Sequence, residues 1–96
     1  MKILNLSPGF QMPPQIGEIP FEAFTFNGGE PHIKLAELPD DKQEEILIAQ
    51  RVTSSEAFMQ LLLATDALRR AGFRKISAWL QIGRAHVWTP VTLIYL

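Results

Sequence analysis

The stretch "ILIAQRVTSSEAFMQLLLATDALRRAGFRKISAWL", residues 46–80, decides the fold class of this chain. The apolar run at 45–52 predicts a buried strand, and the run at 75–80 predicts a second one. Between them, residues 53–72 repeat apolar side chains at helical spacing, which predicts an amphipathic helix. Because the joints are short, these elements predict a right-handed crossover between two parallel strands, which is an α/β arrangement.

Both ends of this helix have recognisable signals. Thr53 and Glu56 have the spacing of a capping box, in which a hydroxyl and a carboxylate each bond a backbone N–H. Gly72 is a good residue to end the helix, because a glycine adopts the left-handed conformation at little cost. Asp66 and Arg69 are three residues apart and are expected to form a solvated ion pair. The face expected to be buried consists of Phe58, Leu61, Leu62, Thr65 and Leu68.

Ahead of this unit, the sequence predicts a β-hairpin. Residues 18–26 and 31–38 alternate apolar and polar side chains, and Asn27-Gly28-Gly29 between them is typical of a turn. The opening run at 2–6 predicts another buried strand. Residues 7–17 contain three prolines and two glycines, which predicts a loop. The coarse prediction is therefore a hairpin combined with a parallel strand-helix-strand unit.

The composition excludes several classes of protein. The chain has 96 residues, which fits one small domain or part of a larger one, and 47% of them are apolar, which argues against disorder. A formal net charge of -1 indicates no nucleic-acid partner and no anionic membrane surface. The absence of cysteine excludes disulfides and thiolate zinc sites and is typical of a cytoplasmic protein. No apolar run reaches the roughly 20 residues of a membrane span.

Few residues indicate chemistry by themselves. His32 and His86 are isolated, and we expect His32 to be a solvent-facing strand residue rather than a ligand. The charged segment 39–45 is expected to be a solvated connection, because its carboxylates lack the spacing of a calcium loop. Phe26 is either a core residue or a stacking platform, and Glu30 either accepts bonds from a ligand or is an exposed carboxylate. These residues predict no catalytic site and no metal site within the chain.

Three stretches in order resemble the N-terminal part of ribose-phosphate pyrophosphokinases. They are "KILNL" near the start, "FTFNGGEPHIKL" at 24–35, and the strand-helix-strand stretch quoted above. The family has a hairpin with a Phe-x-Asp-Gly-Glu signature, then a strand, a polar cap and a helix whose core is close to "LLATDALRR" at 62–70. The resemblance covers residues 1–80, which we expect to be a truncated N-terminal domain, a fragment of a phosphoribosyltransferase-type fold.

This resemblance implies an enzyme that transfers diphosphate from ATP to ribose 5-phosphate, giving phosphoribosyl diphosphate and AMP. It also implies magnesium as the cofactor and a homo-oligomer in which nucleotide binds between subunits. By position, Phe26 would pack on the adenine and Glu30 would accept a hydrogen bond from the nucleotide. Gly28 stands where the family usually has an aspartate, so nucleotide affinity or specificity is expected to differ. The family's catalytic residues and Mg²⁺ ligands have no counterpart here, so we expect this chain to be inactive alone.

The last stretch, "QIGRAHVWTPVTLIYL" at 81–96, departs from the family, which continues with Pro-Tyr and Ala-Arg-Gln-Asp. It resembles the conceptual translation of a sequencing-adapter oligonucleotide, which predicts a tail that is not native. The alternative is a genuine strand or hairpin over 86–96, because this part is rich in strand-forming residues. Two other functions are open: a non-catalytic regulatory relative that binds synthetase subunits, and a small α/β interaction module.

Overall fold

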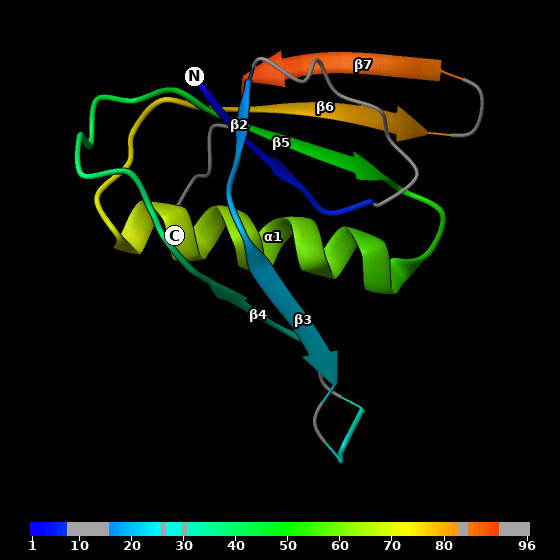
Figure 1. Ribbon diagram of the computed structural model, residues 1–96. Coiled ribbons are helices and arrows are strands. Elements are labelled where there is room, and N and C mark those ends of the chain that lie inside the picture. The colour runs from blue at the N-terminus through cyan, green and yellow to red at the C-terminus, as the bar shows by residue number, and fades with distance from the viewer. Residues whose placement is uncertain (8–15, 26, 30, 83–84, 91–96) are drawn as a thin grey trace, which may run out of the picture.

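One long helix lies between a five-stranded sheet and a separate two-stranded hairpin in the computed structural model of the chain (Figure 1). The structure describes residues 1–7, 16–25, 27–29, 31–82 and 85–90. The elements in chain order are β1 (Lys2–Asn5), β2 (Gly17–Glu18), β3 (Phe21–Thr25), β4 (Pro31–Leu35), β5 (Ile46–Arg51), α1 (Ser55–Arg70), β6 (Ile76–Ile82) and β7 (Ala85–Pro90).

The five-stranded sheet has the order β2-β1-β5-β6-β7. Its first four strands are parallel, with Ile3 opposite Leu47 and Ile48 opposite Ala78, and β7 is antiparallel to β6. Helix α1 connects the neighbouring parallel strands β5 and β6, which confirms the predicted strand-helix-strand unit. The chain is therefore α/β, with an added antiparallel hairpin.

The core forms between the sheet, α1 and the hairpin. Strand β5 is buried on both faces, with Leu47 and Ala49 on one side and Ile46 and Ile48 on the other, as expected of a central parallel strand. Burial of each large aliphatic side chain stabilises the fold by about 1.5–3 kcal/mol. The cluster around α1 consists of Leu4, Leu6, Ile19, Ile33, Ile46, Ile48, Leu61, Ala64, Leu68, Phe73, Ile76 and Ala78.

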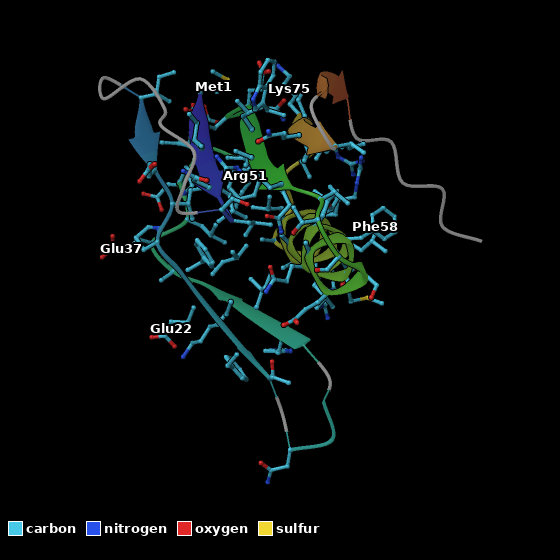
Figure 2. All side chains as sticks on the ribbon, turned by 90° about the vertical axis from the view of Figure 1, so that its right-hand side faces the viewer. Met1, Glu22, Glu37, Arg51, Phe58 and Lys75 are labelled. Carbon is cyan, nitrogen blue, oxygen red and sulfur yellow. The ribbon has the colours of Figure 1, made fainter. Side chains whose placement is uncertain are left out.

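The N-terminus of α1 differs from the prediction by one residue. Ser54, not Thr53, is the N-cap: its backbone is extended and its Oγ accepts a hydrogen bond from the Ala57 N–H at 3.1 Å. The predicted capping box of Thr53 and Glu56 is therefore wrong. Phe58 was expected on the buried face but is 50% exposed, because it points sideways, away from both the sheet and the hairpin (Figure 2).

The C-terminus of α1 ends as predicted. Gly72 has a left-handed φ of 106°, and the Phe73 N–H donates to the Leu68 carbonyl at 3.1 Å. The ion pair in this turn joins Asp66 to Arg70 at 2.9 Å, rather than to Arg69 as expected. Residues four apart lie on the same side of a helix, so this pairing is as well placed as the predicted one.

The hairpin is shorter than predicted at its first strand. Glu18, which was predicted in the hairpin, and Gly17, which was predicted in the 7–17 loop, instead form β2, which pairs in parallel with β1. Pro20, which has no N–H to donate, separates the two strands, and its carbonyl accepts from the Ala36 N–H at 3.0 Å. On β4 the predicted alternation is confirmed, because Ile33 is buried and His32 is exposed.

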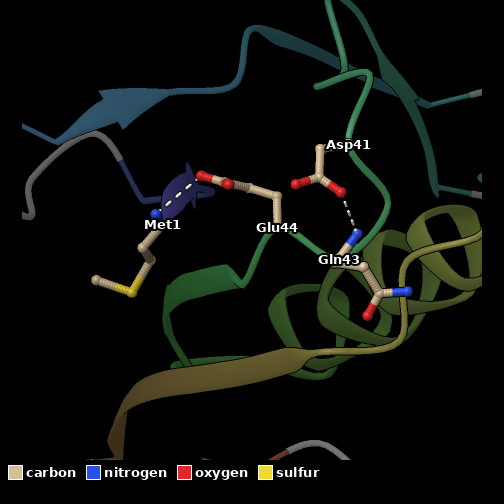
Figure 3. Close-up of polar contacts among 4 residues, drawn as sticks. All are labelled: Met1, Asp41, Gln43 and Glu44. Carbon is tan, nitrogen blue, oxygen red and sulfur yellow. Dashed lines mark hydrogen bonds and ion pairs between the residues drawn. The ribbon is translucent and has the colours of Figure 1, made fainter.

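The charged segment 39–45 is a connection, as predicted, and local polar contacts hold it. Figure 3 shows the Gln43 N–H donating to the Asp41 carboxylate at 2.9 Å, and the Met1 ammonium paired with Glu44 at 2.8 Å. These contacts tie the start of β1 to the segment that leads into β5. Within the described part of the chain, no helix is long and apolar enough to cross a membrane.

The end of the chain adds a strand to the sheet. β6 continues to Ile82, and β7 pairs with it in a register that runs from Ser77 opposite Pro90 to Ile82 opposite Ala85. This agrees with the alternative prediction of a genuine strand near the C-terminus, although the strand begins at residue 85 rather than 86. Most of the predicted 7–17 loop and residues 91–96 lie outside the described residues.

Candidate functional site

The hairpin turn and the first turn of α1 border one open pocket of about 270 Å³. Its described lining consists of Thr25, Gly29, Ser55, Glu56 and Met59. Thr25 is the last residue of β3. Gly29 has a φ of 85°, a conformation that favours glycine. Because glycine has no side chain, its backbone borders the pocket directly. We call this space the turn-helix pocket.

In the sequence, the predicted nucleotide-binding residues Phe26, Gly28 and Glu30 are direct neighbours of Thr25 and Gly29, which line this pocket. Gly28 is exposed in the turn, next to Gly29, and a Cβ added to it would meet no atom within 4 Å. The aspartate that the family has at this position would therefore fit without a clash. Phe26 and Glu30, the other two predicted residues, lie outside the described residues.

The prediction from sequence missed the helix side of the pocket. Glu56 was assigned to the capping box, but with Ser54 as the N-cap it is the second residue of α1 and its side chain is exposed. A carboxylate in the first turn of a helix is favoured by the helix dipole. The sequence "TSSE" at 53–56 contains three residues that can act as N-cap. With Ser54 in place of Thr53 as the N-cap, Glu56 is no longer at the capping-box position, and this alternative could have been read from the sequence.

A buried amide fixes the helix side of the pocket to the sheet. The Gln50 side chain, 2% exposed, donates from Nε2 to the Ala57 carbonyl at 3.1 Å and to Gln60 Oε1 at 3.3 Å. Its Oε1 accepts from the Ser7 hydroxyl and, at 3.1 Å, from the Arg51 N–H. Every hydrogen-bonding position of this amide is used, so the first turns of α1 are held against the carboxyl ends of β1 and β5.

A second open pocket, of about 390 Å³, lies where β1 and β2 end. Its described lining is Asn5, Glu18, Ile19, Pro20 and Phe21. The carboxyl ends of parallel strands are a common place for ligands in α/β proteins. The turn-helix pocket is the better candidate, because Thr25 and Gly29 in its described lining are the sequence neighbours of the residues predicted to bind nucleotide, whereas no such neighbour is in the described lining of this second pocket.

The described lining of the turn-helix pocket can form hydrogen bonds and apolar contacts with a ligand. It offers the hydroxyls of Thr25 and Ser55, the carboxylate of Glu56 and the apolar side chain of Met59. Among the described residues, no group of three or more His, Asp or Glu side chains is placed to hold a metal ion.

The fold and the pocket together define an α/β chain in which a hairpin turn and a helix start form a small polar site. In comparisons with known proteins, no family model, no curated protein and no solved structure matches this chain.

Proposed function

We propose that this chain carries a nucleotide-binding part of a ribose-phosphate pyrophosphokinase, folded as a piece of a phosphoribosyltransferase-type domain. The observation that carries the proposal is the turn-helix pocket. The hairpin and the helix are the two longest segments of the resemblance, and they border this one pocket although they are far apart in the sequence. A nucleotide site built from a signature turn and a polar helix start agrees with this arrangement.

The role proposed for the chain is to bind ATP. Phe26 would pack on the adenine and Glu30 would accept a hydrogen bond from the nucleotide, as the resemblance implies. Transfer of diphosphate to ribose 5-phosphate needs the family's catalytic residues and Mg²⁺ ligands, which have no counterpart in residues 1–80. We therefore expect ATP binding without formation of AMP, in a cytoplasmic protein whose full-length form is a homo-oligomer.

Gly28 provides the test of this proposal. Gly28→Asp restores the acceptor that the family has, and the structure leaves open space for the new side chain. We expect the variant to bind ATP about tenfold more tightly in isothermal titration calorimetry, because one good hydrogen bond contributes about 1.4 kcal/mol. Ala36→Asp is the matched control, since it adds the same charge at an exposed position beyond the other end of β4.

The outcomes of this titration separate the proposals. Equal tightening by Gly28→Asp and Ala36→Asp would show a general effect of charge rather than a restored contact. If neither the original chain nor the Gly28→Asp variant binds ATP, the nucleotide-binding proposal is wrong. Formation of AMP from ATP and ribose 5-phosphate by the chain alone would contradict the expected lack of transfer.

A second candidate function, a small α/β interaction module, is favoured by one observation. β7 pairs with β6 along most of its length and so forms an edge of the sheet, where another chain can add a strand. Hydrogen exchange measures this directly. Protected amides in 85–90, together with no binding of ATP, would favour the module over the enzyme fragment.

A further inference from the structure

Asn27 and Gly28 are neighbours in the turn that joins β3 to β4. Figure 1 shows this turn at the end of the hairpin that lies away from the five-stranded sheet. Neither residue has the positive φ for which hairpin turns select asparagine and glycine, and Gly29 has it instead. The conformation of the turn therefore does not require an asparagine followed by a glycine at these two positions.

An asparagine that precedes a glycine can react with its own main chain. The backbone nitrogen of the glycine loses its proton and attacks the side-chain carbonyl carbon of the asparagine. A C–N bond forms, the bond from that carbon to the amide nitrogen breaks, and this nitrogen leaves as ammonia after taking up a proton. The five-membered succinimide ring then reacts with one water molecule and opens at either of its two carbonyl carbons. The products are aspartate and isoaspartate, and water is the only co-reactant.

The surroundings of Gly28 leave its nitrogen open to this reaction. Gly28 is exposed, and a Cβ added to it would meet no atom within 4 Å. No described residue accepts a hydrogen bond from the Gly28 N–H. Asn27, which supplies the carbonyl carbon, is exposed as well. Ring closure here displaces no packed side chain and breaks no hydrogen bond of the Gly28 N–H to a described residue.

Asn5 is the other asparagine of the chain, and its surroundings oppose the same reaction. The nitrogen that would have to attack belongs to Leu6, whose N–H donates to the Ala49 carbonyl at 2.9 Å. The side-chain Oδ1 of Asn5 accepts a hydrogen bond from the Ser7 N–H at 3.2 Å. Asn5 also lies in β1, which the parallel sheet holds in register with β5. Ring closure at Asn5 would therefore break hydrogen bonds that the fold maintains.

We propose that Asn27 is a site of spontaneous deamidation, where the chain converts to aspartate or isoaspartate. The inference goes beyond the proposed function and does not depend on nucleotide binding. Either product adds a negative charge to a chain whose formal net charge is -1. Isoaspartate also adds one carbon atom to the main chain between residues 27 and 28, in the turn whose Gly29 borders the turn-helix pocket.

The test follows both asparagines in the purified 96-residue chain during incubation at pH 6 and at pH 9. Cleavage after Glu18 and Glu22 places Asn5 and Asn27 on separate peptides, and mass spectrometry measures the conversion of each amide to a carboxyl group. We expect Asn27 to convert at least about tenfold faster than Asn5, because the Leu6 N–H must first give up a hydrogen bond. Conversion should be faster at pH 9, since the attacking nitrogen must lose its proton.

Two variants complete the test. Gly28→Ala should slow conversion of Asn27 by about tenfold, because the added Cβ hinders the attacking nitrogen and restricts the backbone. The open space at Gly28 keeps the fold unchanged, which circular dichroism checks, and the rate at Asn5 is the control in the same molecule. Asn27→Gln should show almost no conversion at position 27, since its longer side chain must close a six-membered ring.

Three results would overturn the inference. The first is equal conversion of Asn27 and Asn5 in the original chain, which would show that the exposed turn gives no advantage. The second is an unchanged rate at Asn27 in Gly28→Ala. The third is conversion in Asn27→Gln as fast as in the original chain, which would mean that the reaction does not pass through the five-membered ring.

Discussion

Replacement of Gln50 tests whether the buried amide holds α1 against the sheet. Gln50→Met keeps nearly the same shape and removes four hydrogen bonds, each worth about 1 kcal/mol net. Two of the former partners of Gln50 keep another hydrogen bond. The Arg51 N–H still donates to Ser7 Oγ at 2.8 Å, and the Ala57 carbonyl still accepts a hydrogen bond within the helix. Burial of the apolar methionine side chain offsets about 1–2 kcal/mol of this loss in the free energy of unfolding. We expect a net loss of about 2–3 kcal/mol.

Gln50→Glu adds a dependence on pH to the same test. A carboxylate here would lose both Nε2 donors and face the Ala57 and Gln60 oxygens in a site that is 2% exposed. Burial would raise the pKa of the new carboxyl above its unfolded value of about 4.3. Stability is then greatest below the unfolded pKa and falls as pH rises through the folded pKa. The deficit relative to the original chain should therefore be larger at pH 7 than at pH 4.

Urea unfolding followed by circular dichroism measures both variants at the two pH values. The original chain, measured at the same pH values, removes contributions from all other titrating groups. The reasoning fails if Gln50→Met unfolds within about 0.5 kcal/mol of the original chain, the range typical of an uninvolved surface residue. It also fails if the deficit of Gln50→Glu is the same at pH 4 and pH 7.

Two further predictions use pairs of neighbouring residues. Ser54→Ala should lower the free energy of unfolding by about 1 kcal/mol because it removes the cap, whereas Thr53→Ala should change it by less than about 0.5 kcal/mol. Equal losses for the two variants in urea unfolding would contradict Ser54 as the N-cap. Gly29→Ala should cost about 1–2 kcal/mol, because alanine is strained at a φ of 85°, whereas Gly28→Ala meets no atom and should be nearly neutral. A thermal melt that moves equally for both glycine variants would refute the assigned turn geometry.

The elements that the sequence predicted well are those whose signals are local. β5, α1 and β6 follow from apolar runs and helical spacing, and Gly72 ends the helix where its left-handed conformation is needed. The two faces of β4 follow from alternation alone, with Ile33 inside and His32 outside. For these features, the residues that carry the signal are neighbours in the chain.

The features that the sequence did not predict depend on distant partners. Glu18 was predicted in the hairpin and Gly17 in the preceding loop, but both pair in parallel with the edge strand β1 as β2. Thr53 and Ser54 are both residue types that cap helices, and the backbone conformation at the end of β5 decides that Ser54 is the N-cap. Phe58 has the right spacing for the core, but its position beside the sheet leaves it exposed.

The same division applies to the candidate site. The sequence by itself determined the α/β unit, the hairpin and the identity of its turn residues, because period and turn chemistry act over a few residues. Only the tertiary structure decided that Gly29 and Glu56 border one pocket and that Ser54, rather than a capping box with Glu56, caps the helix. Packing of β4 on α1 through Ile33 brings the two segments together, and no local pattern encodes a contact between residues so far apart in the chain.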